Sequence, residues 1–339
     1  MSDPFWRFGV ELAIEQVYGE TEPVRIWAFP RTQEASATAP VDTVRAYERE
    51  EPDAHWHYVG LGLSSPDLGH DGALRCELTF RLERGDEDLP PQWPADLIQH
   101  VADYVLETGH DVGPGHTFDL NAPVVPDSRS ALRHLFFAPD PDLGALFVQA
   151  VGITSDELAA LEQWSGFAAV LAQNVPGFVT RPSRTSTLAL PGVMEAVAAG
   201  AETEGSIRAV CVVSTLQVTP SRNLADRLAG RRRITVTMTT HPIDSLRRAL
   251  LGRLARGEPL MVRGPDAELL LVPEAGAGPH REQPNCWVVG LLPEQATDLA
   301  DTLAPVPGTY RAPTLPHVSF DLRPSPVTGL SAPESDPAW

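Results

Sequence analysis

Strict alternation of side chains in two short segments constrains the fold of this chain most. Residues 76–82 place Leu78, Phe80 and Leu82 on one side and polar side chains on the other. Residues 55–63 alternate in the same way, with His55, His57, Val59, Leu61 and Leu63 opposite Trp56, Tyr58, Gly60 and Gly62. A period of two is typical of strands, so both segments are predicted to lie in a sheet, and residues 76–82 are predicted to have one buried face.

Helical patterns are interspersed with these strands. Pro94 suits a first helical turn, an apolar stripe runs through Leu97, Val101 and Tyr104, and Gly109 ends the segment. Residues 154–157, Thr-Ser-Asp-Glu, form a capping-box pattern, and we expect one helix to continue from there through Leu158, Leu161, Trp164, Phe167 and Leu171. Gly60 and Gly62 expose backbone, which we interpret as close packing against a helix in preference to docking of a peptide.

The remaining first half is predicted as a helix over 5–18, strands over 24–29, 146–151 and 208–218, and an irregular surface excursion over 30–54. The second half is predicted as strands over 234–239, 260–262, 269–272, 287–292 and 317–322, with helices over 243–256 and 293–303. We therefore expect an α/β (α+β) fold. Its expected parts are a mixed-sheet amino-terminal domain over 1–220, a linker over 221–233, a smaller α/β carboxy-terminal domain over 234–322 and a disordered tail over 323–339.

Charge and cysteine content narrow the function. A formal charge of −19 argues against nucleic acid and anionic membranes as partners, because both would be repelled, and favours a basic partner. The three cysteines, Cys76, Cys211 and Cys286, are widely spaced and form no CxxC, as expected of reduced thiols in a cytoplasmic protein. The first residues carry charges within their apolar stretch, unlike a signal peptide, and no apolar run is long enough for a membrane helix.

Catalytic signals are weak. No GxSxG, Walker A, HExxH or GxGxxG motif occurs. His55 and His57 are spaced as two metal ligands on a strand, but further ligands are missing nearby in sequence, so we interpret them as part of a core-facing row. His110, Asp111 and His116 lie in a Gly-Pro loop, where solvated polar residues are common. We expect neither a metal nor another cofactor.

Several of these residues together resemble the Suppressor of fused (SUFU) family. The matching residues are His55-Trp56-His57-Tyr58 with Gly62-Leu63-Ser64, residues 77–82, Pro91 with Trp93-Pro94-Ala95, Ala102 with Tyr104-Val105, Val151-Gly152-Ile153 with Glu157-Leu158 and Trp164, and residues 202–206. The helix at 250–257 and the segment from Leu291 resemble the family's carboxy-terminal domain more faintly.

The resemblance implies a two-domain, non-enzymatic protein that holds a partner segment as an added strand between its domains. In the animal members the partner is a transcription factor, gripped partly by a tyrosine and an acidic residue. Here the tyrosine is Tyr104, and His116 occupies the position of the acid, which changes an acceptor-only group to an imidazole. We predict a partner-binding site at Tyr104 and His116, with Asp111 and Trp56 as further contacts.

The resulting hypothesis is a cytoplasmic bacterial immunity protein that sequesters a polymorphic toxin or effector in an interdomain cleft. The alternatives are a metal-dependent hydrolase that uses His55, His57, His110 and His116, and a scaffold or adaptor with several partners.

Overall fold

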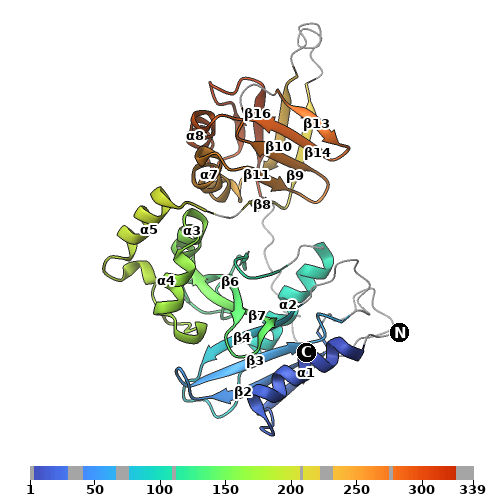
Figure 1. Ribbon diagram of the computed structural model, residues 1–339, viewed down its shortest axis with the longest axis vertical. Helices are drawn as coiled ribbons and strands as arrows, with labels where there is room; N and C mark the ends of the chain where they lie inside the picture. The colour runs from blue at the N-terminus through green and yellow to red at the C-terminus, as the bar shows by residue number, and fades with distance from the viewer. Residues whose placement is uncertain are drawn as a thin grey trace, which may run out of the picture. The chain divides into compact units, whose positions relative to one another are not determined.

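A computed structural model describes residues 4–29, 41–65, 76–108, 112–206, 209–221, 232–274 and 278–325. The chain divides into two compact units, one formed by residues 1–161 and 166–198 and the other by residues 162–165 and 199–339 (Figure 1). The expected linker lies largely outside the described residues, as does the expected tail beyond residue 325.

The amino-terminal unit is built on a mixed seven-stranded sheet. Its strand order is β1-β2-β3-β4-β7-β6-β5, and β4 pairs with β7 in parallel while all other pairs are antiparallel. The strands are β1 (Arg25–Ala28), β2 (Thr43–Arg49), β3 (His55–Leu61), β4 (Glu77–Glu83), β5 (Thr117–Asp119), β6 (Leu132–Asp140) and β7 (Gly144–Thr154). Its helices are α1 (Pro4–Tyr18), α2 (Trp93–Thr108) and α4 (Phe167–Asn174), with short 3-10 turns η2 (Pro176–Phe178) and η3 (Thr187–Ala189). Helices α3 (Ser155–Gln163) and α5 (Val193–Thr203) begin in this unit, and their last residues belong to the other.

Two helices cover opposite faces of this sheet. The face under α2 forms an apolar cluster that includes Trp56, Tyr58, Phe80 and Ile98. The close-packing interpretation of Gly60 is confirmed, because a Cβ atom there would lie 2.9 Å from Ile98 Cγ2 on α2. The other face packs against α1 through Val10, Ile14 and Tyr18.

The expectation that β4 has one buried face was wrong. Glu77 and Thr79 are fully buried, and Arg81 is 1 % exposed, so the polar side of β4 is also inside. These side chains are tolerated there because each has hydrogen-bond partners. The Glu77 carboxylate accepts from the backbone N–H groups of residues 62–64 and from the Ser64 hydroxyl, and Thr79 and Arg81 donate to Asp140. The row of residues 55–63 is also shorter than expected: β3 ends at Leu61, and Leu63 lies in the core on the α2 side.

The excursion expected over residues 30–54 was also wrong over its second half, because β2 lies there. Tyr47 of β2 stacks on Tyr18 of α1 with ring centroids 3.7 Å apart, and Arg45 forms an ion pair with Glu11 at 3.0 Å. The strand escaped notice because its helix-facing positions alternate charged and aromatic residues, which give no apolar row.

The helix expected to run from residue 154 through Leu171 is two helices. The capping box at its start is confirmed: Glu157 Oε2 accepts from Thr154 N at 2.9 Å. The break falls after Gln163, where the Trp164 indole donates to Glu204 Oε2 at 2.7 Å instead of continuing the helical stripe.

The carboxy-terminal unit contains two sheets. Their orders are β15-β16-β10-β9 and β13-β14-β12-β11-β8. The strands are β8 (Val210–Val212), β9 (Leu216–Pro220), β10 (Ile234–Thr239), β11 (Leu260–Arg263), β12 (Glu268–Val272), β13 (His280–Gln283), β14 (Cys286–Gly290), β15 (Gly308–Tyr310) and β16 (Val318–Arg323). Since β8 pairs with β11 and β9 with β10, both strands belong to this unit, on the far side of the expected boundary at residue 220.

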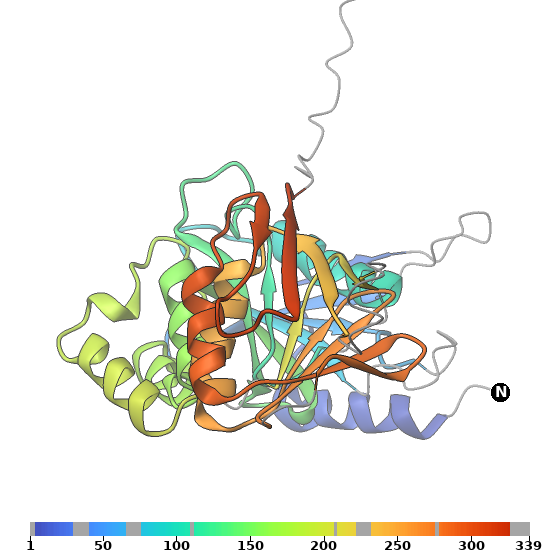
Figure 2. The ribbon, with the colours of Figure 1, turned by 90° about the horizontal axis from the view of Figure 1, so that it is seen from above.

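Two helices pack side by side in this unit, α7 (Ile243–Gly252) and α8 (Pro293–Thr302), as Figure 2 shows. Leu246 and Leu250 of α7 and Leu299 of α8 enter one core with the strands. The expected helix over 243–256 ends as a short 3-10 turn, η4 (Leu254–Arg256), and Gly257 stops it at φ +85°, a conformation that favours glycine.

Candidate functional site

Tyr104 lies in an aromatic cluster beside an edge of the amino-terminal sheet. Its ring packs edge-on against the ring of Phe118 of β5, with centroids 4.9 Å apart. The His100 ring also packs edge-on against Phe118, with centroids 6.2 Å apart. His100 and Tyr104 are four residues apart on α2 and therefore project from the same side of the helix. Because β5 is the last strand of the sheet, this cluster flanks a strand edge.

His116 immediately precedes the same strand and is exposed. Its backbone N–H donates to Gly113 O at 3.0 Å in a tight turn, and its carbonyl accepts from Phe137 N of β6 at 3.0 Å. Tyr104 thus lies against β5, and His116 lies immediately before that strand.

The other two predicted residues do not join this surface. Trp56 is 2 % exposed, and its indole N–H donates to Glu87 Oε1 at 2.9 Å, so it is part of the core and not a surface contact. Asp111 lies outside the described residues, together with His110.

His55 and His57, the histidines of the hydrolase alternative, are fully buried. His57 Nδ1 lies 2.6 Å from the Tyr18 hydroxyl, and its Nε2 lies 3.0 Å from Asp140 Oδ2. His55 Nδ1 lies 2.7 Å from the Asp53 carbonyl oxygen, to which it donates. Within the described ranges, no group of three or more His, Cys, Asp or Glu side chains is arranged to hold a metal ion.

Asp140 is the centre of this buried polar network. Its carboxylate accepts from Thr79 Oγ1 at 2.7 Å, from Arg81 Nη2 at 3.1 Å and from the backbone N–H groups of Asp142 and Leu143 at 2.9 Å. Although burial opposes ionisation, the neighbouring His57 and Arg81 keep the pKa of Asp140 well below its usual value.

The histidines remain neutral next to this carboxylate. Burial lowers the pKa of His57 and lowers that of His55 to about 4. A neutral His57 with its proton on Nε2 donates to Asp140 and accepts from Tyr18, so both nitrogens are satisfied. A relay of Tyr18, His57 and Asp140 could move a proton, but its groups are occupied by one another, and we assign it a structural role.

The carboxy-terminal unit has its own exposed strand edge. β8 is the last strand of the five-stranded sheet, and its Val210 and Val212 are 37 % and 45 % exposed. The sequence analysis selected neither Phe118 nor this valine pair for a binding site. It predicted one strand over 208–218, where the structure has the two strands β8 and β9, and it did not predict that β8 lies at an edge.

No helix within the described ranges is long and apolar enough to cross a membrane. The fold and the site define a two-unit α/β protein in which the edge strand β8 carries exposed valines and the edge strand β5 carries a partly buried phenylalanine. The sequence model of the Suppressor of fused protein (SUFU) family matches residues 37–185, which include the whole edge element around β5. Over these residues the chain is similar in sequence to the Suppressor of fused family.

Individual relatives show the same similarity. The human and mouse Suppressor of fused homologs are each 32 % identical to this chain over 201 residues, which cover 49 % of this chain and 41 % of theirs. The matched stretch thus spans less than half of those relatives. The crystal structure of Drosophila Suppressor of Fused has the same fold, with a TM-score of 0.67 at 19 % identity over 91 % of this chain and 94 % of that one.

Proposed function

We propose that this protein is a non-enzymatic binding module that captures a segment of another protein by adding it as a strand to its sheet edges. Strand addition obtains affinity from main-chain hydrogen bonds and specificity from pockets for alternate side chains. The single observation that carries the proposal is the edge of β8.

The backbone of β8 presents unused ladder positions. Ala209 O accepts from Met261 N, and Val213 N donates to Arg263 O, both at 2.8 Å. Because successive residues of a strand alternate in the direction of their backbone groups, those of Val210 and Val212 point away from β11. An added strand would gain hydrogen bonds there and would cover both valine side chains.

The edge at β5 supports the proposal from the amino-terminal unit. The aromatic cluster of Tyr104, Phe118 and His100 offers a hydrophobic contact surface with polar tips, a composition typical of binding hot spots. His116 can donate or accept a hydrogen bond at the start of the strand. Trp56 is not included, because its side chain is buried.

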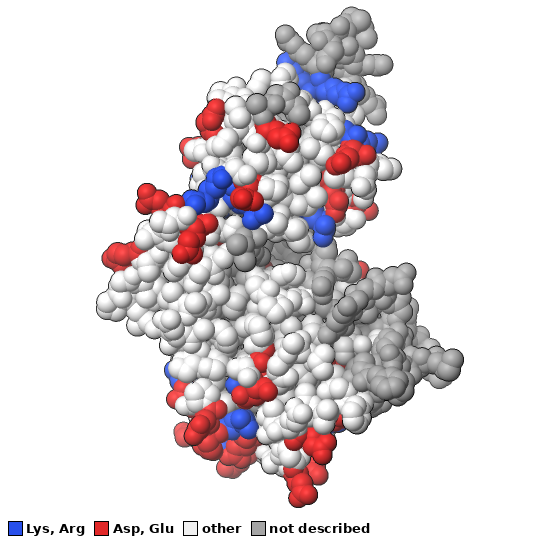
Figure 3. Space-filling model, viewed as in Figure 1, with Lys and Arg blue, Asp and Glu red and all other residues white. Residues whose placement is uncertain are grey.

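The partner we propose is a toxin or effector, with this chain as its bacterial cytoplasmic immunity protein. The net charge of −19 would attract a basic partner and accelerate encounter. Figure 3 shows acidic side chains at many places on one face of the molecule. Neutralisation by sequestration requires tight binding and no chemistry.

The test begins with a tagged chain in its native host, followed by mass spectrometry of what co-purifies. Affinity for the recovered partner is then measured for Val212→Pro, which removes one outward N–H group and leaves the bonds to β11 in place. The control is Val306, another exposed valine of the same unit. Proline cannot be used there, because Val306 N donates to Ala304 O. We therefore compare Val212→Asp as the test variant with Val306→Asp as its matched control.

We expect at least a tenfold loss of affinity for Val212→Pro and Val212→Asp, with the melting temperature within a few degrees of wild type, and no loss for Val306→Asp. Tyr104→Ala combined with His116→Asp should alter affinity in the same assay. Equal affinity of all variants, or recovery of no protein partner, would refute strand addition. Many weak partners without a dominant one would replace the immunity role with that of an adaptor.

A further inference from the structure

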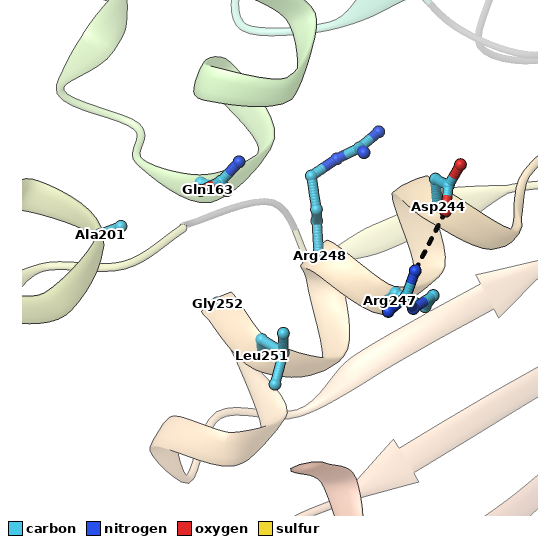
Figure 4. A pocket seen from close by; sticks show the side chains of 7 residues that line it. All are labelled: Gln163, Ala201, Asp244, Arg247, Arg248, Leu251 and Gly252. Atoms are coloured by element: carbon cyan, nitrogen blue, oxygen red, sulfur yellow. Dashed lines mark hydrogen bonds and ion pairs between the residues drawn. The ribbon is translucent and has the colours of Figure 1, made fainter. Parts of the chain in front are cut away.

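A pocket of about 410 Å³ lies entirely within the carboxy-terminal unit (Figure 4). One wall is α7, which contributes Asp244, Arg247, Arg248, Leu251 and Gly252, and the opposite wall contains Gln163 and Ala201. The volume is at the lower end of the range for small-molecule sites. Two adjacent cationic side chains and an exposed leucine therefore line one pocket.

The wall that contains Ala201 is preformed. Arg256 donates to the carbonyl oxygens of Glu202 and Thr203 at 2.7 Å each. These bonds provide donors for backbone carbonyl groups that have no partner within the last turn of α5. Trp164 packs directly on Gly200, where no side chain would fit. Two segments that the sequence analysis singled out, residues 202–206 and 250–257, thus meet next to this pocket, and little reorganisation is needed for a ligand to bind.

Arg247 is oriented for a ligand but weakly paired. Its Nε donates to Ala300 O at 2.8 Å, which fixes the plane of the guanidinium. Its ion pair with Asp244 is long, 3.4 Å, and the two side chains are 39 % and 51 % exposed. Such a pair contributes little, so a carboxylate that contacts the guanidinium in a bidentate manner can replace it.

Arg248 supplies a second cation that is held more firmly. Its Nε donates to Glu162 Oε2 at 2.6 Å, and its side chain is 25 % exposed. Its Nη2 contacts the same Glu162 oxygen at 2.5 Å and lies 3.4 Å from Ser245 Oγ. Figure 4 shows Arg248 extending from α7, with Leu251 projecting from a later turn of the same helix. Leu251 is 44 % exposed and offers an apolar contact beside the two cations.

We propose that this pocket binds a carboxylate that adjoins an apolar side chain, with the carboxylate on Arg247 and Arg248 and the apolar group on Leu251. The carboxyl-terminal residue of a polypeptide and a free N-acylated amino acid both have this chemistry. The site uses no strand edge, so it stands or falls independently of the function proposed above.

The test titrates the isotope-labelled full chain with N-acetyl-Leu-Leu as the free acid and as its carboxyl-terminal amide, followed by NMR chemical shifts. We expect saturable shifts for the acid at Gln163, Ala201 and Gly252, and at least tenfold weaker binding of the amide. Arg247→Gln and Leu251→Glu should each weaken binding of the acid at least tenfold. Arg263→Gln, which removes an exposed arginine paired with Glu268 in the same unit, is the matched control and should bind as wild type.

Since Arg247 and Leu251 are both partly exposed, the variants should keep the wild-type melting temperature, which is measured alongside. Equal binding of acid and amide, no saturable shift at millimolar concentration, or wild-type affinity of Arg247→Gln would overturn the proposal. Titration with N-acetyl-leucine and with longer peptides then distinguishes the sources. Affinity that rises with peptide length assigns the site to a polypeptide terminus, and affinity already complete with one residue assigns it to a small acid.

Discussion

Replacement of Asp140 by alanine should destabilise the amino-terminal unit by about 3 kcal/mol. The carboxylate is buried and is the acceptor for Thr79, for Arg81 and for two backbone N–H groups. Removal of one partner of a buried ion pair costs about 3–5 kcal/mol, because the other charge remains unpaired in the interior. We take the lower end, since Arg81 keeps Asp142 Oδ2 at 2.9 Å.

Asp140→Asn should lower the free energy of unfolding by less, about 1–2 kcal/mol, because it removes the charge from one hydrogen-bonding partner. The amide oxygen can still accept from both backbone N–H groups. The amide nitrogen can donate to His57 if that ring moves its proton to Nδ1 and donates to Tyr18, so the direction of the chain of hydrogen bonds reverses. Asp142→Asn is the matched control: its side chain is 30 % exposed, and its loss should cost under about 1 kcal/mol.

The assay is urea unfolding of the full chain, with the midpoint of the amino-terminal unit as readout. With a slope of about 2–3 kcal/mol per molar for a unit of this size, alanine should lower the midpoint by about 1–1.5 M. A cost of Asp140→Ala below about 1 kcal/mol, or a cost of Asp142→Asn as large as that of Asp140→Ala, would refute the reasoning about the buried charge.

Three further predictions concern the same unit. His55 has a pKa of about 4 in the folded state and 6.5 in the unfolded state, so its contribution to stability is complete above pH 6.5 and is lost as the pH falls toward 4. Over that pH range the difference in unfolding free energy between wild type and His55→Gln, measured by urea titration, should fall by at most about 3 kcal/mol. A difference that does not change with pH would contradict this prediction. Gly60→Ala should lower the free energy of unfolding by about 1–3 kcal/mol, because the added methyl group overpacks against Ile98. Gly113→Ala has open space around it and should change the free energy of unfolding by under about 0.5 kcal/mol; equal effects would disprove the packing argument. Glu157→Gln should lower the free energy of unfolding by about 2–4 kcal/mol in the same assay, because the buried carboxylate accepts from Nη1 and Nη2 of Arg184 at 2.6 and 2.7 Å. An unchanged stability would show that the pair is dispensable.

The fold was predicted best from the sequence where a segment has a row of apolar side chains on the face that packs against the core. β3, β4 and α2 each have an apolar face against the same core, and their positions are confirmed. The pattern failed where burial was polar. β2 was overlooked because Arg45 and Tyr47 face α1, and the buried side of β4 was taken as solvent-facing because Glu77 and Arg81 are charged. Pairing across 59 residues, as between Arg81 and Asp140, leaves no local trace in the sequence.

The candidate site was predictable in part. The resemblance to the family selected Tyr104 and His116, and the structure places both at β5. Trp56 was selected because of the same resemblance, yet its indole serves the core through Glu87. Val210 and Val212 could not be selected, because only their place at the end of a sheet distinguishes them from other short apolar segments.

The coverage of the amino-terminal sheet explains why its binding surface should lie at an edge. α2 closes one face with an apolar core, and α1 closes the other over a network of paired polar groups. A partner could reach either face only by displacing a helix, which would expose the buried clusters and leave Asp140 and Arg81 without their shielding. An edge strand offers backbone groups and flanking side chains without that loss. The recognition that we propose at β5 would use what two-sided burial of this sheet leaves accessible.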